Sequence, residues 1–194
     1  MPRAARVVVE GVPHHITQRG NNRQDVFLVD EDRRYYLEIL RDKCRQHGVT
    51  LLGYCLMTNH VHLIGVPRQP TSLALAPGPG PLALRGALPS TLPPQRPFVA
   101  KPLLFVSVRA PSLGHRAGLC GPESTAGGAG GEPLQYPWSS AAAHVAGRDP
   151  IGLVDEWEWT ELELQSDWKQ RLETKMGEGD EAELRQATYS AIRR

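Results

Sequence analysis

The distribution of proline and glycine constrains this 194-residue chain more than any other feature. Residues 77–133 contain 11 Pro and 10 Gly in 57 positions, whereas the other 137 residues contain 6 Pro and 9 Gly. Both residue types disfavour the interiors of helices and strands. A structureless run of this length is also unusual inside a compact domain. The sequence therefore predicts an irregular middle segment between two parts of different character.

Charge divides the chain in the same way. Residues 1–76 carry 10 Lys or Arg against 7 Asp or Glu, residues 77–133 carry 5 against 2, and residues 134–194 carry 7 against 12. The mild basic excess in front permits a nucleic-acid partner without requiring one. The three cysteines lack Cys-x-x-Cys spacing, which favours a reducing cytoplasm over a disulfide framework or a cysteine zinc site. We expect a cytoplasmic protein, since no apolar run suits a signal peptide or a membrane span.

The N-terminal part has a regular alternation of strand and helix patterns. It predicts a strand, a helix and two further strands, at residues 14–19, 30–47, 49–57 and 60–66. We place the N-cap of the helix at Asp30 and its end at Gly48. A hairpin after a crossover helix predicts an α+β fold with an antiparallel sheet of the ferredoxin-like or RRM-like kind. Beyond the middle segment, we expect a small-residue helix over 139–146 and acidic helices over 156–194.

The sharpest chemical feature is the sequence His60-Val61-His62 on the last of these strands. Alternate residues of a strand point to the same face, so the two imidazoles stand side by side and could share a divalent cation. An isolated pair of this kind is also compatible with exposed or hydrogen-bonded histidines, and the spacing alone leaves both readings open. His14 and His15 are adjacent and face opposite sides of their strand, so they cannot readily chelate one ion together.

A cluster of arginine and asparagine residues lies at the end of the first predicted strand and directly after it. Arginine side chains and exposed amides at such a place could contact a nucleic-acid backbone or splayed bases. A solvated turn explains the same composition. The residues are Arg19, Asn21, Asn22 and Arg23.

Several segments together carry a family resemblance. They are PHHITQRGNNRQDVF at 13–27, VDEDRRYYLEIL at 29–40, GYCLMTNHVHLIGVP at 53–67 and YPWSS at 136–140. Their combination resembles the REP-associated tyrosine transposases, a branch of the single-tyrosine HUH transposases found on bacterial mobile elements. The resemblance covers about half of the chain. It implies a ferredoxin-like fold, often dimeric, that binds hairpin-forming single-stranded DNA.

The resemblance also implies a reaction. The histidine pair would hold a divalent ion, Mg²⁺ or Mn²⁺, on the scissile phosphate, while a tyrosine on a later helix attacks the phosphorus. The products would be a 5′-phosphotyrosine link and a 3′-hydroxyl. In this branch the tyrosine lies in a motif like Y-V-x-L-N-P-x-R-A-G, and the asparagine would be a third metal ligand. On this chain the implied metal ligands are His60 and His62, and the implied DNA contacts are His15, Arg19, Asn21, Asn22 and Arg23.

The chain departs from the family because it lacks that tyrosine motif. Its five tyrosines are Tyr35, Tyr36, Tyr54, Tyr136 and Tyr189. The motif should fall within 77–133, and we interpret this segment as the family's sequence read in a shifted frame. One base later, possible codons for Pro77–Pro81 give Leu-Gly-Arg-Ala, and those for Pro122–Thr125 give Leu-Asn-Pro-Leu. A tyrosine codon can straddle Leu119 and Cys120. A genuine disordered Pro/Gly-rich insertion is the alternative.

These observations predict four parts and an inactive enzyme. The parts are an N-terminal transposase portion with the histidine pair, an irregular frame-shifted segment, a remnant of the transposase domain and a helical C-terminal extension, at residues 1–76, 77–133, 134–150 and 151–194. Cleavage should be absent because the nucleophile, the third ligand and the second helix and strand of the fold are missing. We expect a degenerate transposase that binds hairpin DNA. The alternatives are a non-catalytic nucleic-acid-binding module on an RRM-like sheet and the inert product of a decayed gene.

Overall fold

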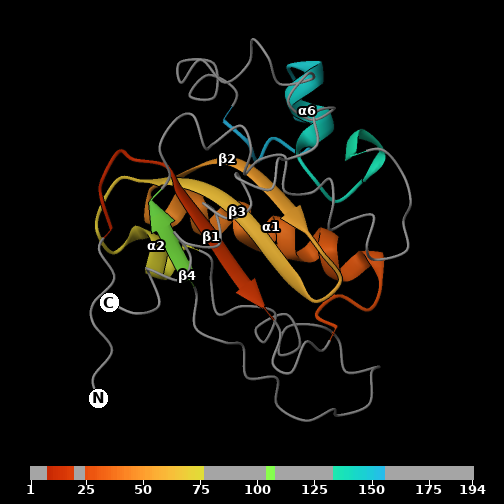
Figure 1. Cartoon of the computed structure of the whole chain (residues 1–194), viewed down its shortest axis with the longest axis horizontal. Coiled ribbons are helices and arrows are strands. Elements are labelled where there is room, and N and C mark those ends of the chain that lie inside the picture. The colour runs from red at the N-terminus through yellow and green to blue at the C-terminus, as the bar shows by residue number, and fades with distance from the viewer. Residues whose placement is uncertain (1–7, 20–24, 77–103, 108–132, 156–194) are drawn as a thin grey trace, which may run out of the picture.

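An antiparallel sheet organises the part of the chain that the computed structural model describes, which is residues 8–19, 25–76, 104–107 and 133–155. The elements are β1 (His14–Arg19), α1 (Asp30–His47), β2 (Val49–Leu56), β3 (His60–Pro67), α2 (Ser72–Leu75), β4 (Leu104–Ser107), the 3-10 helix η2 (Pro133–Gln135) and α6 (Ala141–Ala146). The strand order is β2-β3-β1-β4 (Figure 1). Every neighbouring pair is antiparallel. The order strand-helix-strand-strand-helix-strand in such a sheet is the ferredoxin-like arrangement, so the predicted fold class is confirmed.

The register between β1 and β3 decides which side chains share a face of the sheet. Thr17 lies opposite His62, and Arg19 lies opposite His60. Because side chains alternate along a strand, these four residues and His15 stand on one face. A shift of one residue would move them all to the other face.

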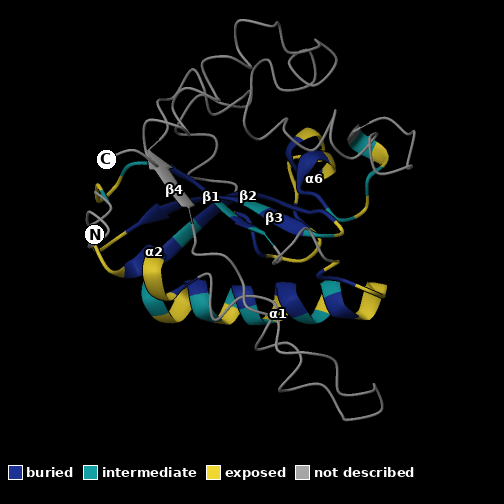
Figure 2. Cartoon of the chain, turned by 60° about the horizontal axis from the view of Figure 1, so that its bottom comes forward, coloured by how far each residue is buried: buried dark blue, intermediate teal, exposed yellow. Residues whose placement is uncertain are grey.

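The other face of the sheet is the core face, covered by α1 and α2. In Figure 2, α1 lies beneath the sheet while α6 lies on the opposite side. The apolar stripe of α1 is buried, at Tyr36, Leu37, Leu40 and Cys44. It packs on sheet residues including Ile16, Val61 and Leu63, and on Leu73 of α2. Burial of this apolar surface is the main stabilising contribution, and it fixes the histidine-bearing face away from α1.

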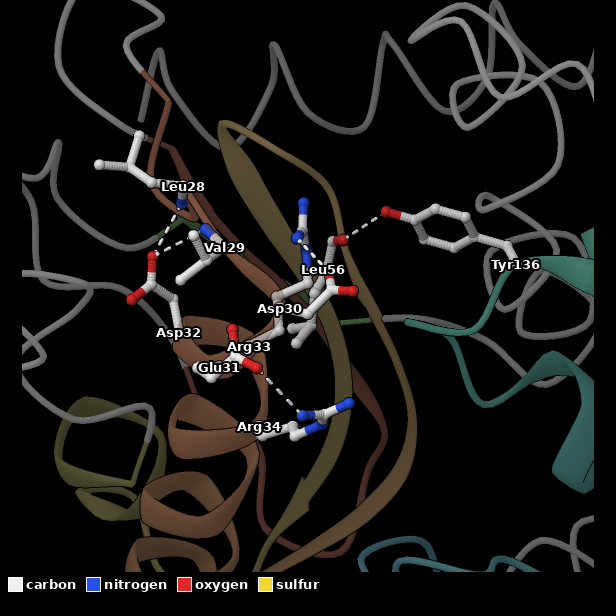
Figure 3. A network of polar contacts seen from close by, with 9 residues as sticks. All are labelled: Leu28, Val29, Asp30, Glu31, Asp32, Arg33, Arg34, Leu56 and Tyr136. Carbon is white, nitrogen blue, oxygen red and sulfur yellow. Dashed lines mark hydrogen bonds and ion pairs between the residues drawn. The ribbon is translucent and has the colours of Figure 1, made fainter.

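The start of α1 differs from the prediction. The N-cap is Val29, and Asp30 is the first helical residue. The carboxylate of Asp32 accepts hydrogen bonds from the backbone N–H of Leu28 at 2.8 Å and of Val29 at 3.2 Å (Figure 3). Asp30 is exposed and forms an ion pair with Arg33 at 3.1 Å. Asp30 as the N-cap is therefore wrong, because an acidic residue one turn into the helix reaches back and caps in its place.

Asp32→Ala should lower the free energy of unfolding by about 1–2 kcal/mol, because it leaves two backbone N–H groups at the helix start without their acceptor. Asp30→Ala is the matched control. It removes the same side chain two residues away and breaks only the ion pair between the exposed Asp30 and the largely covered Arg33, for which we expect a loss below about 1 kcal/mol. Denaturant titrations of both variants measure the difference. Equal losses would contradict the capping role of Asp32.

The end of α1 is where the sequence places it. Gly48 has φ 63° and ψ 53°, the left-handed conformation that glycine adopts without strain. Its backbone N–H donates to the carbonyl of Cys44. The chain therefore reverses at once into β2. None of the helices in the described part of the chain is long and apolar enough to cross a membrane.

β4 corrects two predictions, that the whole of 77–133 is irregular and that the last strand of the fold is missing. The four-residue helix α2 (Ser72–Leu75) takes the place of the second helix, which is also predicted to be missing. Within 77–133, Leu104–Ser107 pairs with β1, with Val106 opposite His15. The surrounding residues 103–108 read LLFVSV and contain neither Pro nor Gly. Their apolar and β-branched composition favours a strand. Residues 77–103, 108–132 and 156–194, which include the predicted acidic helices, lie outside the described residues.

The YPWSS sequence at 136–140 closes the outer edge of β2. The backbone N–H of Leu56 donates to the carbonyl of Trp138 at 2.9 Å, and that of Ser140 donates to the carbonyl of Tyr54 at 3.0 Å. The hydroxyl of Tyr136 donates to the carbonyl of Leu56 at 2.7 Å (Figure 3). An uncovered strand edge invites pairing with other chains. This segment therefore completes the sheet from a distant part of the sequence, directly before α6.

Candidate functional site

His60 and His62 stand side by side at the beginning of β3, on the face that α1 and α2 do not cover. Their ring centroids are 4.8 Å apart, and the ring planes make an angle of 77°. His60 is buried and His62 is half-buried. Val61, between them, points into the core and is 1 % exposed. The strand period thus places the two imidazoles together, as the sequence predicts.

A neighbouring amide fixes the orientation of the first imidazole. The Nδ1 atom of His60 lies 2.6 Å from Oδ1 of Asn59. An amide oxygen only accepts hydrogen bonds, so Nδ1 of His60 carries the proton and donates it. A neutral imidazole then has its basic nitrogen at Nε2. Asn59 therefore selects the nitrogen through which His60 could bind a metal.

His15 adds a third imidazole to this cluster. Its Nε2 atom lies 2.9 Å from Nδ1 of His62, and the two rings are nearly parallel, with an angle of 3° and centroids 5.1 Å apart. The hydroxyl of Thr17 lies 3.4 Å from each of these two nitrogens. The sequence predicts only a DNA contact for His15. The contact with His62 follows from the β1–β3 register, which the sequence alone does not provide.

The chemistry of these donors fits a divalent ion in part. Imidazole nitrogens suit transition metals, whereas Mg²⁺ prefers oxygen ligands. Nowhere in 8–19, 25–76, 104–107 or 133–155 does the structure arrange three or more His, Cys, Asp or Glu side chains to hold a metal. The two histidines therefore supply two ligands, and any others must come from water, from a substrate oxygen or from residues beyond those ranges.

Of the predicted DNA contacts, the structure brings Arg19 next to the histidines. It ends β1 opposite His60 and is half-buried. The predicted contacts at Asn21, Asn22 and Arg23 lie outside the described residues. So do Leu119 and Cys120, where the shifted frame would place the tyrosine.

A serine, a histidine and an aspartate also come together near α6, which the sequence does not predict. Nε2 of His144 lies 3.2 Å from Oγ of Ser140. That Oγ also accepts the backbone N–H of Tyr54 at 3.0 Å. Burial lowers the pKa of His144 to about 4, and the negative charge of Asp149 partly opposes the shift. The carboxylate of Asp149 accepts backbone N–H groups at 3.0, 2.8 and 2.9 Å, from Ile151, Leu153 and Val154.

This cluster is structural and does not form a catalytic triad. Ser140, His144 and Asp149 are each 9 % exposed or less, so a substrate has no access to the serine oxygen. A histidine with a depressed pKa is also a poor base at neutral pH. The cluster holds the segment that closes β2. Only Ser140, as part of YPWSS, carried a signal in the sequence.

A basic hollow lies at the other end of the sheet. It has a volume of about 400 Å³ and is lined in part by Arg41, Arg45, Arg68 and Asp155. It opens where β2 begins and β3 ends, while the histidines lie at the beginning of β3. The hollow is therefore a separate feature from the histidine cluster.

Comparison with known families identifies the segment that carries the histidines. Residues 8–74 match the family model described as transposase IS200 like. This segment, about a third of the chain, is therefore similar to the IS200-like transposases. The match includes all of β1, α1, β2 and β3, and therefore both histidines of the pair and His15.

A solved structure shares the fold of this chain. Its title is "Structure of the REP associates tyrosine transposase bound to a REP hairpin", and the TM-score is 0.56 at 15% identity. The likeness covers 80% of this chain and 92% of that chain. At this level of identity the likeness concerns the fold. A comparison with curated proteins gives no match.

Proposed function

We propose that this chain binds hairpin-forming single-stranded DNA on the histidine-bearing face of its sheet, without cleaving it. The observation that carries the proposal is the grouping of Arg19, His60 and His62 on one face of the family-matched segment. The solved structure with the same fold is bound to a REP hairpin, which supports the choice of ligand. A guanidinium beside two imidazoles is suited to a phosphate, because it donates in a planar fork.

We also propose that His60 and His62 hold a divalent ion through Nε2 when DNA is bound. The nitrogen donors favour Mn²⁺ over Mg²⁺. A bound ion would act as a Lewis acid on the phosphate. The chain's own contributions are the tautomer of His60, which Asn59 fixes at 2.6 Å, and the positive charge of Arg19 on the neighbouring strand.

The proposed lack of cleavage rests on where the tyrosines lie. Tyr36 and Tyr54 are buried in the core on the α1 side of the sheet, and burial raises the pKa of Tyr36. Tyr35 also belongs to α1 and packs against that core. The hydroxyl of Tyr136 donates to the carbonyl of Leu56. Within the described residues these positions favour the binding-only alternative, a nucleic-acid-binding module on an RRM-like sheet. Tyr189 lies outside them.

The cause that we propose for the missing nucleophile is the shifted reading frame. The support is that the same one-base offset, applied to possible codons along the segment, gives Leu-Gly-Arg-Ala, then a tyrosine codon, then Leu-Asn-Pro-Leu. This is the order in which the family has them. The proposed frame shift does not remove the fourth strand of the sheet, because residues 104–107 as encoded form β4 and pair with β1. The nucleotide sequence of the gene decides the matter. Codons of Leu119 and Cys120 that give no tyrosine one base out of frame would refute the proposal.

Arg19→Ala should weaken binding to a DNA hairpin with single-stranded flanks by about 3–10-fold and reduce the slope of log affinity against log salt by about 1. Fluorescence anisotropy over a range of salt concentrations measures both quantities. Arg34→Ala is the matched control, because it removes an arginine that lies exposed on α1 and pairs with Glu31 at 3.3 Å. The wild type should also prefer the hairpin to a blunt duplex of the same stem. Equal effects of the two substitutions would contradict binding on the histidine-bearing face.

A further inference from the structure

The contact between His15 and His62 joins two ring nitrogens, and this restricts where their protons lie. Nε2 of His15 and Nδ1 of His62 are 2.9 Å apart. A hydrogen bond between two imidazole nitrogens contains one proton, so one ring donates and the other accepts. A neutral imidazole carries its single N–H at one nitrogen only. The direction of this hydrogen bond therefore determines which nitrogen of His62 is basic.

The two possible directions differ in their consequence for a metal. If His15 donates, His62 accepts at Nδ1 and carries its own proton on Nε2, which then cannot bind a metal ion. If His62 donates from Nδ1, its Nε2 is deprotonated and can coordinate. In that case His15 accepts at Nε2 and carries its own proton at Nδ1. Only the second direction gives His62 the same ligand nitrogen that Asn59 selects for His60.

We infer that His15 is a positioning residue for the metal site, which accepts the Nδ1 proton of His62 and directs the Nε2 atom of His62 toward the ion. Metal-binding histidines commonly donate their other N–H to a carboxylate, a carbonyl or water, and such partners orient the ring and select its tautomer. Here a third histidine has that role. It is placed by the β1–β3 register and is only 9 % exposed, so its ring is confined. The inference rests on the proposed metal function of His60 and His62.

The near-parallel rings add a geometric argument. The ring planes of His15 and His62 differ by only 3°, so the two imidazoles share one orientation. The hydroxyl of Thr17 lies 3.4 Å from Nε2 of His15 and from Nδ1 of His62. Both distances are too long for a strong hydrogen bond. The orientation of His62 therefore depends on His15 more than on Thr17.

The experiment measures Mn²⁺ binding to the full chain by the loss of the free-ion EPR signal. His15→Leu should weaken Mn²⁺ binding by about 10–100-fold, because His62 loses the acceptor for its Nδ1 proton. His15→Gln should recover most of this loss, since its amide oxygen can accept the same proton. Thr17→Val should change the affinity by less than about 3-fold. His14→Gln is the matched control, an imidazole removed one residue away whose Nδ1 contacts the carbonyl of Val12 at 2.6 Å.

The double variant His60→Ala/His62→Ala separates this inference from the proposed function. If the wild type binds no more Mn²⁺ than the double variant, the metal proposal itself fails. If the wild type binds and the double variant does not, but His15→Leu binds like the wild type, the inference fails while the metal site stands. Equal losses in His15→Leu and His15→Gln would contradict the acceptor role. Thermal unfolding without metal checks that each variant is folded.

Discussion

Incubated with hairpin-bearing single-stranded DNA and Mn²⁺, the chain as encoded should bind the DNA but release no cleaved strand and form no covalent protein–DNA adduct. The reaction that the family resemblance implies requires a tyrosine oxygen at the phosphate beside the metal. Tyr36 and Tyr54 are buried in the core, and Tyr35 packs against it. The hydroxyl of Tyr136 donates to the carbonyl of Leu56, and Tyr189 lies outside the described residues. We propose that no tyrosine of the encoded chain reaches this position, and binding and charge stabilisation alone produce little turnover.

Restoring the proposed reading frame should create the activity. The variant carries a one-base deletion near the codon of Ala76 and a one-base insertion near that of Gly131, so that only the intervening segment is read in the other frame. Removal of a nucleophile typically costs several orders of magnitude in rate, so we expect a gain of at least about 10³-fold over the encoded chain. A denaturing gel that detects labelled DNA attached to protein measures the adduct. Changing the restored tyrosine codon to phenylalanine should abolish the adduct.

Two controls make this result decisive. Tyr136→Phe in the encoded chain keeps the ring that packs near Cys55 and Met57 and removes only the hydroxyl. Cleavage by the encoded chain that disappears in this variant would show that Tyr136 is the nucleophile and would overturn the assignment. A frame-restored chain that binds the hairpin and still forms no adduct would refute the shifted-frame explanation.

The parts of the fold that the sequence predicted are those governed by local chemistry. The strand over 14–19 is confirmed to the residue, and α1 ends before Gly48 because a left-handed glycine stops a helix. The histidines of the pair lie side by side because a strand repeats every two residues. Each of these statements depends on residues close together in the chain.

The features that the sequence missed depend on contacts between distant segments. His15 and His62 are 47 residues apart, and their hydrogen bond requires the β1–β3 register. The contact between Tyr54 and Ser140 spans 86 residues. β4 was missed for a different reason, because a count of Pro and Gly over a long segment hides a short apolar run within it. The cap at Asp32 was missed because two acidic neighbours offer equally plausible acceptors.

The buried histidine beside α6 should make the chain sensitive to acid. Burial lowers the pKa of His144 from 6.5 to about 4, so the unfolded state takes up this proton at a higher pH than the native state does. Stability therefore rises with pH in this window, and it should fall as the pH drops from about 6.5 to about 4. The loss attributable to this group is on the order of 3 kcal/mol. Such a loss is a large share of the total stability of a typical domain.

His144→Leu should remove most of this pH dependence, and the test is the difference in unfolding free energy between the variant and the wild type from pH 7 to pH 4. The difference is the correct quantity because burial also lowers the pKa of His14, which adds a dependence of the same sign in both proteins. Asp149→Asn should extend the loss to lower pH, since the charge of Asp149 opposes the shift of His144. Parallel pH profiles for His144→Leu and the wild type would assign the acid sensitivity to another group. Because His144 contacts Ser140, and Ser140 holds the edge of β2 at Tyr54, protonation of His144 should loosen this edge before the α1 side of the sheet.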